Sequence, residues 1–213
     1  KFRLKTPMGS KEIHLRMVGE HMVSNACAAV GAGLAAGIPL TVCRDALNDL
    51  KGVSGRLEAV PNQRGVHVYV DYAHTDDALS TVLFHLNGIR KTAGTANRII
   101  TVFGCGGDRD RGKRPLMMRA ALERSDLVVL TSDNPRTESP EEILNDAEAA
   151  AQSSEKSRIY REVDRKKGIA KALELAKPGD VVLIAGKGHE DYQIIGTTRH
   201  PFSDFDVVKE LLT

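Results

Sequence analysis

The fold is decided by the stretch Asp126-Leu127-Val128-Val129-Leu130-Thr131-Ser132-Asp133-Asn134-Pro135-Arg136. Its apolar first half predicts a strand buried on both faces, as in a parallel sheet. Its second half places a carboxylate, a carboxamide and a guanidinium on a loop that Pro135 stiffens. Ligands of open α/β sheets bind outside the carboxyl ends of the strands. These opposite charges suit a zwitterion, such as the backbone end of an amino acid. A loop that leads into a helix and carries solvated charges is the alternative.

Two further apolar runs end in a similar way. Residues 98–103 run into Gly104-Cys105-Gly106-Gly107-Asp108-Arg109-Asp110, and residues 180–185 run into Gly186-Lys187-Gly188-His189-Glu190-Asp191. Each end combines charged side chains with glycines, which allow close approach of the backbone. We expect the three strand ends to converge on one crevice of a parallel sheet.

Strand and helix patterns alternate along most of the chain. We expect strands at 11–18, 66–71, 98–103, 126–131, 158–162 and 180–185, and helices at 26–36, 39–50, 75–91, 115–124, 140–152 and 164–176. Residues 52–58 predict a turn, residues 191–202 a hairpin turning at Gly196, and a last helix begins at Ser203. Thr75 and Ser139 suit helix N-caps. The alternation predicts an α/β fold, a Rossmann-like, mostly parallel sheet with helices on both faces, and a domain boundary near residue 61.

Composition narrows the classes of function. A net charge of +2 and 4% aromatic residues without Trp disfavour a nucleic-acid-binding surface. No apolar run is long enough to span a membrane, and we expect no signal peptide. Three cysteines, Cys27, Cys43 and Cys105, have no close pairing and no accompanying His cluster, which predicts a cytoplasmic protein without disulfides or structural zinc. Because the chain starts without Met, we expect it to be part of something longer.

One segment imitates a phosphate-binding loop. Residues 107–114 follow a strand and nearly spell the P-loop pattern, but Arg114 stands where a hydroxyl should hold magnesium. Residues 104–107 also lack the glycine spacing of a dinucleotide fingerprint. Cys105 has no recognisable partner base, so a small residue in a tight turn is favoured over a nucleophile.

Three more sites stay ambiguous when each is taken by itself. Asp71 and His74 at a strand end suit ribose or phosphate, or else a cap and a surface histidine. Arg56 in a glycine turn suits phosphate, or simply solvent. Asn25 lies near a helix start, where capping is the simpler interpretation.

The motifs taken together are more informative. In order, the chain carries Gly19-x-His21-x-x-x-Asn25, Ser54-Gly55-Arg56-x-Glu58, Asp71-Tyr72-Ala73-His74-Thr75, Phe103-Gly104-Cys105-Gly106-Gly107-Asp108-Arg109, Asp133-Asn134-Pro135-Arg136 and Gly186-Lys187-Gly188-His189-Glu190-Asp191. This series spans the whole chain and resembles the Mur ligases, in particular those that add 2,6-diaminopimelate.

The resemblance implies an ATP-dependent acid–amino-acid ligase of peptidoglycan biosynthesis. ATP would phosphorylate UDP-N-acetylmuramoyl-L-alanyl-D-glutamate, and the amine of meso-2,6-diaminopimelate would attack the acyl phosphate. Residues 1–60 would be the tail of a central ATPase domain, and residues 61–213 a C-terminal Rossmann-like domain. ATP and Mg²⁺ would be held mainly upstream of Lys1, so we expect no metal ligands here and no activity of this chain alone. The family also implies a cytoplasmic protein, which we expect to be a monomer.

The resemblance also implies roles for individual residues. Diaminopimelate would be recognised by Asp133, Asn134, Pro135 and Arg136, completed by Arg109, Gly186 and Glu190. On the ATP side, Asn25 would contact adenine, Arg56 the γ-phosphate and Asp71 the ribose or a phosphate, with His74 nearby. The two arginines suit carboxylates through bidentate pairs, whereas Asp133, Glu190 and the Gly186 carbonyl suit an ammonium.

Other functions remain open on the sequence. A dinucleotide-binding oxidoreductase domain would bind a nicotinamide cofactor, and the broken glycine fingerprint argues against it. A non-catalytic amino-acid-binding module would share the fold and the pocket. A related ligase that adds glutamate or lysine would share the mechanism and differ in the pocket.

Overall fold

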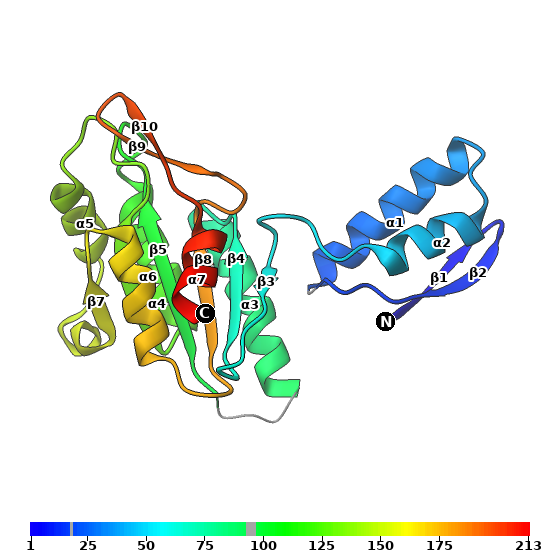
Figure 1. Ribbon diagram of the computed structural model, residues 1–213, viewed down its shortest axis with the longest axis horizontal. Helices are drawn as coiled ribbons and strands as arrows, with labels where there is room; N and C mark the ends of the chain where they lie inside the picture. Colours follow the sequence, from blue (N-terminus) through cyan, green and yellow to red (C-terminus); the bar gives the residue numbers. More distant parts are fainter. Residues whose placement is uncertain (18, 93–96) are drawn as a thin grey trace. The chain divides into compact units, whose positions relative to one another are not determined.

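The computed structural model describes residues 1–17, 19–92 and 97–213, which fall into two compact units, Lys1–Val53 and Ser54–Thr213 (Figure 1). The expected boundary near residue 61 falls after the first strand of the second unit.

The first unit pairs a hairpin with two helices. Strands β1 (Phe2–Thr6) and β2 (Gly9–Ile13) are antiparallel, and helices α1 (Glu20–Ala35) and α2 (Leu40–Asp49) follow. Its hydrophobic cluster has Ile13, Val30 and Leu40 as buried members.

The second unit is built on a six-stranded sheet. Its strands are β3 (Glu58–Val60), β4 (His67–Asp71), β5 (Ile99–Cys105), β6 (Leu127–Ser132), β7 (Ile159–Arg161) and β8 (Val181–Ala185), in the order β3-β4-β8-β5-β6-β7. Only the edge pair β3–β4 is antiparallel. All seven residues of β5 are buried, as its unbroken apolar run requires in a central parallel strand. The predicted α/β fold is confirmed.

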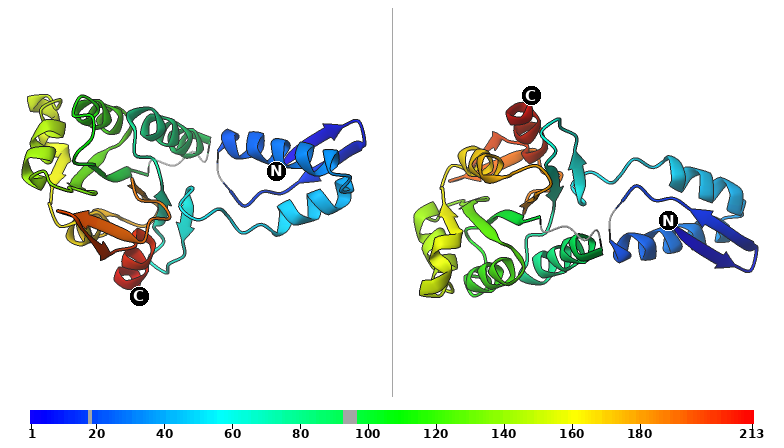
Figure 2. Two further views of the ribbon diagram at one scale, coloured as in Figure 1. Left: turned by 90° about the horizontal axis from the view of Figure 1, so that it is seen from above. Right: turned by 90° about the horizontal axis from the view of Figure 1, so that it is seen from below.

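Helices cover both faces of this sheet. They are α3 (Asp76–Thr92), α4 (Lys113–Arg124), α5 (Pro140–Glu148), α6 (Arg165–Leu175) and α7 (Asp204–Leu212). Figure 2 shows α3 and α4, in green, on the face opposite α6 and α7, in orange to red. Apolar residues of α6 and α7 pack with strand residues such as Ile100 and Val182 in one cluster.

The strand order creates a switch point in the sheet. After β5 the chain enters α4, and after the neighbouring strand β8 it forms a hairpin and then enters α7, on the opposite face. The chain therefore leaves these two strands in opposite directions and opens a crevice between their carboxyl ends. Such a crevice is where α/β sheets bind ligands.

Most helix starts agree with the sequence. Thr75 Oγ1 accepts from Ala78 N–H, and Asp164 and Ser203 cap α6 and α7 with their side chains. Ser139 occupies the N-cap position of α5, but its side chain makes no capping hydrogen bond. The hairpin of β9 (Tyr192–Ile195) and β10 (Thr198–Pro201) confirms the predicted turn at Gly196.

Several predicted elements were wrong in extent. The strand expected at 11–18 ends at Ile13, with residue 18 outside the described part, and its partner β1 was missed. The helix expected at 26–36 begins at Glu20, and the helix expected at 140–152 ends at Glu148 before a 3₁₀ turn at Ser153–Arg158. β3 was predicted as part of a turn because three residues carry no periodicity, and pairing with β4 makes them a strand.

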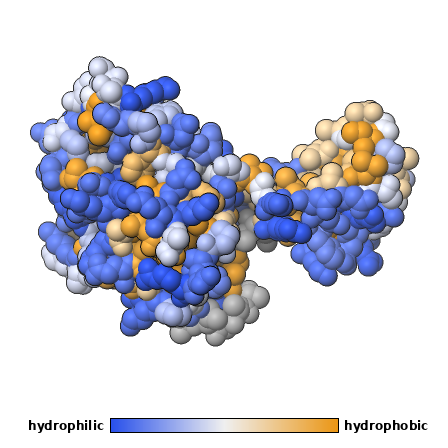
Figure 3. All heavy atoms as spheres, viewed as in Figure 1, coloured by the Kyte–Doolittle hydropathy of each residue, from blue (hydrophilic) through white to orange (hydrophobic). Residues whose placement is uncertain are grey.

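The face of the second unit seen in Figure 3 is mostly hydrophilic, with hydrophobic residues between the hydrophilic ones. Among the described residues, no helix is both long and apolar enough to cross a membrane.

Candidate functional site

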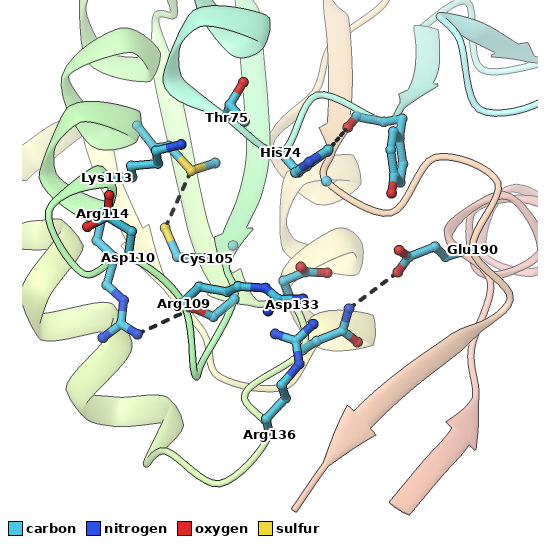
Figure 4. Close-up of a pocket in the computed structure, with 16 residues that line it drawn as sticks. His74, Thr75, Cys105, Arg109, Asp110, Lys113, Arg114, Asp133, Arg136 and Glu190 are labelled. Atoms are coloured by element: carbon cyan, nitrogen blue, oxygen red, sulfur yellow. Dashed lines mark hydrogen bonds between the residues drawn. The ribbon is translucent and has the colours of Figure 1, made fainter. Parts of the chain in front are cut away.

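A cavity of about 340 Å³ lies at the carboxyl ends of β4, β5, β6 and β8 (Figure 4). Its lining joins segments that are far apart in the sequence: Tyr72, His74, Thr75, Gly104, Cys105, Gly106, Arg109, Asp110, Lys113, Arg114, Met117, Asp133, Asn134, Arg136, Gly186 and Glu190. The predicted convergence of the three strand ends on one crevice is confirmed.

Glycines near the end of β5 and directly after it allow this segment to touch β6 and the loop after β6. A Cβ on Gly104 would lie 2.4 Å from Thr131 O, and one on Gly107 would lie 1.9 Å from Pro135 O. Gly107 N–H donates to Asn134 O at 2.9 Å. The absence of side chains therefore brings the two segments within direct hydrogen-bonding distance, which any larger residue would prevent.

The β9–β10 hairpin fixes the shape of the loop after β6. Arg136 N–H donates to Ile194 O at 3.1 Å, and Gly196 N–H donates to Arg136 O at 2.8 Å. Gln193 Nε2 donates to Asp133 O at 2.6 Å. Arg136 has a φ of 51°, a conformation that side chains rarely adopt, so these bonds stabilise a strained residue.

Opposite charges face one another across the cavity. In Figure 4, Arg109 and Arg136 extend from different loops toward Asp133, and Glu190 approaches from the opposite side. Arg136 Nη1 donates to Gly107 O at 2.6 Å, which holds one side of its guanidinium. The site therefore offers guanidinium groups for a carboxylate and carboxylates for an ammonium within one small volume.

Lys187 is a member of this site that the sequence analysis did not single out. Its side chain is fully buried, and Nζ lies 3.1 Å from Asp133 Oδ1 and 3.0 Å from Asn134 Oδ1. A lysine between two glycines directly after a buried strand was the available signal, because a charged residue there must find a partner.

A second buried cation, Arg165, forms hydrogen bonds to the carboxyl ends of β6 and β8. Arg165 and Asp204 form an ion pair with both side chains fully buried. Arg165 also donates to Ser132 O at 3.1 Å and to Ala185 O at 3.0 Å, the last residues of β6 and β8. Although burial opposes the charge, the Asp204 carboxylate raises the pKa of Arg165, so the guanidinium stays charged.

Glu138 ties the arginine-rich loop to the loop after β6. It accepts from Arg114 Nη2 at 2.7 Å and from Arg111 Nη2 at 2.8 Å, and also from Asp108 N–H. These donors, Arg114 first, lower the pKa of Glu138 to about 2. Arg114 is 1% exposed and pairs with Asp146 as well, so this arginine has a structural role in a loop that only resembles a P-loop.

Cys105 lines the cavity but is not an activated thiol. Burial raises its pKa to about 12, and it is 4% exposed. A thiolate is therefore disfavoured at neutral pH. This agrees with the sequence-based preference against a nucleophile, although Cys105 is the last residue of β5 and not part of a tight turn.

The ATP-side candidates Arg56 and His74 lie around Tyr72, just after the carboxyl end of β4, and Tyr72 and His74 also line the cavity. Arg56 lies 5.0 Å from the Tyr72 ring centroid, and the His74 and His189 rings lie 4.6 Å and 5.2 Å from it. Gly55 packs on the backbone of Gly188, and its carbonyl accepts from Tyr72 N–H at 2.8 Å. The exposed guanidinium of Arg56 suits an anionic group such as phosphate.

The remaining two candidates are placed differently. Asp71 is 5% exposed, and its carboxylate accepts from Leu57 N–H at 2.7 Å and from Ala73 N–H at 2.8 Å. Asp71 thus holds the turn before β3 against the end of β4. Asn25 is exposed on α1 in the first unit, so it is not among the residues that the second unit brings together.

The described residues contain no group of three or more His, Cys, Asp or Glu side chains placed to hold a metal ion.

The sequence of this chain is similar to that of a known protein family and its members. The family described as Mur ligase, glutamate ligase domain, matches residues 55–188. A UDP-N-acetylmuramoyl-L-alanyl-D-glutamate–2,6-diaminopimelate ligase of Oceanobacillus iheyensis is 46% identical over 214 residues, and one of Gloeobacter violaceus is 48% identical over 211 residues. They align with 100% and 99% of this chain, respectively, but this chain spans only 42% of each relative.

A solved structure of a ligase with the same name is also similar. It superposes with a TM-score of 0.70 at 42% identity, and the match covers 99% of this chain and 42% of that one.

Proposed function

Because this chain belongs to the Mur ligase family, we propose that it is the amino-acid-binding part of a ligase that joins meso-2,6-diaminopimelate to UDP-N-acetylmuramoyl-L-alanyl-D-glutamate. ATP would activate the glutamate carboxylate as an acyl phosphate, and the diaminopimelate amine would displace phosphate. Residues 1–60 would belong to the central ATPase domain and residues 61–213 to the C-terminal domain. The three free cysteines suit the reducing cytoplasm in which such a ligase would act.

The observation that carries this proposal is the charge pattern of the cavity. Arg109 and Arg136 point toward the same volume as Asp133 and Glu190. An amino-acid centre presents one carboxylate and one ammonium, which match these two kinds of group. The cavity volume of about 340 Å³ lies at the small end of ligand sites and so suits an amino acid better than a dinucleotide.

Selectivity for diaminopimelate over lysine follows from the same groups. Lysine lacks the second carboxylate, so the guanidiniums would face no partner and would repel the distal ammonium. A pocket for lysine would need fewer cationic groups around the distal ammonium of the substrate. The presence of both Arg109 and Arg136 therefore favours diaminopimelate as the substrate.

On the nucleotide side, Arg56 would contact a phosphate of ATP, with His74 close by on the same aromatic cluster. Asp71 would act at this end by holding the Arg56 turn through Leu57 N–H, and Asn25 would contact adenine from the first unit. ATP supplies the phosphoryl group when it is bound. Protein ligands for Mg²⁺ would come mainly from outside the described residues.

The test is a chimeric ligase in which this chain replaces the matching segment of the Oceanobacillus iheyensis relative. Phosphate release with ATP, Mg²⁺ and the UDP-linked dipeptide should depend on meso-diaminopimelate and should be far slower with L-lysine. Turnover with lysine as good as with diaminopimelate would contradict the proposed substrate. Binding of a nicotinamide cofactor by the chain would favour the oxidoreductase alternative instead.

A further inference from the structure

Lys187 lies behind the cavity, where its ammonium contacts Asp133 and Asn134, two residues that line it. Its side chain is fully buried, which is rare for lysine and requires compensating partners. Nζ lies 3.1 Å from Asp133 Oδ1 and donates to Asn134 Oδ1 at 3.0 Å. It also donates to Tyr192 O at 2.9 Å. One ammonium therefore connects the loop after β8, the loop after β6 and the β9–β10 hairpin.

We propose that Lys187 is a positioning residue for the amino-acid substrate, which it serves by orienting Asn134 and balancing the charge of the Asp133 and Glu190 carboxylates. The substrate part of this inference rests on the function proposed above. Lys187 itself does not line the cavity and acts through its neighbours.

The orientation of the Asn134 amide follows from its donors. Lys187 Nζ and Ile194 N–H, at 2.9 Å, both point at the same end of this side chain. Both groups only donate, so that end must be the carbonyl oxygen. The amide nitrogen then faces the other way, toward Glu190 Oε2 at 3.3 Å. Nδ2 carries two hydrogens, and the second can reach a carboxylate in the cavity beside Arg136.

The charges around Lys187 also suit an amino-acid ligand. Asp133 and Glu190 bring two negative charges, and Lys187, 3.1 Å and 3.8 Å from them, neutralises one. The buried pair Arg165–Asp204 adds no net charge. The carboxylate side of the pocket thus keeps about one negative charge, which suits one ammonium of a zwitterion. Without Lys187, Asp133 and Glu190 would both lose this ion-pair partner.

Lys187→Met in the chimeric ligase tests this role, because Met keeps an unbranched apolar stem and removes the ammonium. We expect the KM for meso-diaminopimelate to rise about 10-fold or more, from the loss of charge-assisted positioning. The KM values for ATP and for the UDP-linked dipeptide should change by less than about 3-fold. The matched control is Lys166→Met, which removes a 47% exposed ammonium paired with Glu210 and should leave all three KM values unchanged.

A merely structural lysine would give a different result. If Lys187→Met lowers kcat and raises all three KM values together, or changes none of them, the positioning role is wrong. A failure of the unmutated chimera to use meso-diaminopimelate would instead reject the proposed function, and would be seen before any variant is compared.

The amide orientation can be tested without a variant of Lys187. In the 213-residue chain, the side-chain NH₂ signal of Asn134 is assigned by its loss in Asn134→Asp. We expect its protons to show nuclear Overhauser contacts to the Glu190 side chain. Contacts to the Ile194 amide proton instead would mean that the amide is reversed and would overturn the proposal, even if Lys187→Met fails to fold.

Discussion

Arg136 offers the sharpest test of the proposed amino-acid site. Its Nη1 donates to Gly107 O at 2.6 Å, which aims the rest of the guanidinium into the cavity. The backbone of Arg136 has a φ of 51° and is held by Ile194 O and Gly196 N–H. Arg136→Ala keeps a Cβ and these backbone bonds, so it does not change the conformational cost of the loop. The variant removes the guanidinium with its stem, including the hydrogen bond to Gly107 O, and leaves the backbone bonds of the loop in place.

The size of the effect follows from the bonds that the guanidinium can still make. A bidentate pair with a substrate carboxylate has two charge-assisted hydrogen bonds, each contributing about 1.5–3 kcal/mol. Losing both should lower kcat/KM for meso-diaminopimelate by about 100-fold or more. Because ATP does not contact this loop in the proposed arrangement, the KM for ATP should change by less than about 3-fold.

The assay is phosphate release by the chimeric ligase with diaminopimelate, with lysine and with varied ATP. Arg136→Lys should restore little activity, because an ammonium cannot reproduce the planar fork. Arg199→Ala is the matched control, since Arg199 is exposed on β10 over the Tyr192 ring and lies outside the cavity lining. If Arg136→Ala leaves diaminopimelate use intact, the loop after β6 is only a turn that leads into α5 and the site assignment is wrong.

Three further predictions concern the chain itself. Gly107→Ala should lower the free energy of unfolding, measured in urea, by about 1–3 kcal/mol, because its Cβ would lie 1.9 Å from Pro135 O. The control Gly88→Ala on α3 meets nothing within 4 Å and should cause no loss. Equal stability of both variants would contradict the tight contact at Gly107. The pKa of Glu138 is lowered to about 2, so its contribution to stability is complete above the ordinary glutamate pKa and is lost as the pH falls toward 2. Glu138→Gln should therefore flatten that part of the curve of unfolding free energy against pH. An unchanged slope would count against the ion pair with Arg114. The chain alone should release no phosphate from ATP in the presence of Mg²⁺, because its P-loop-like segment holds Arg114 buried in ion pairs. Turnover on the order of 1 per second would refute this prediction.

The sequence alone determined most of the local structure. Apolar runs located the central parallel strands β5, β6 and β8, since a strand buried on both faces must be largely apolar. The convergence of residues after β5, β6 and β8 was also predictable, because the carboxyl ends of parallel strands lie along one edge. The family motifs then assigned a chemistry to that edge.

Only the tertiary structure decided how the charges at that edge are held. The burial of Lys187 beneath Asn134, and of Arg165 between Ser132 O and Ala185 O, depends on contacts between segments far apart in the chain. Periodicity records which face of an element is apolar, but it does not record which distant carbonyl or carboxylate will meet a buried cation. The three residues of β3 illustrate the same limit, because pairing with β4, rather than any pattern of their own, makes them a strand.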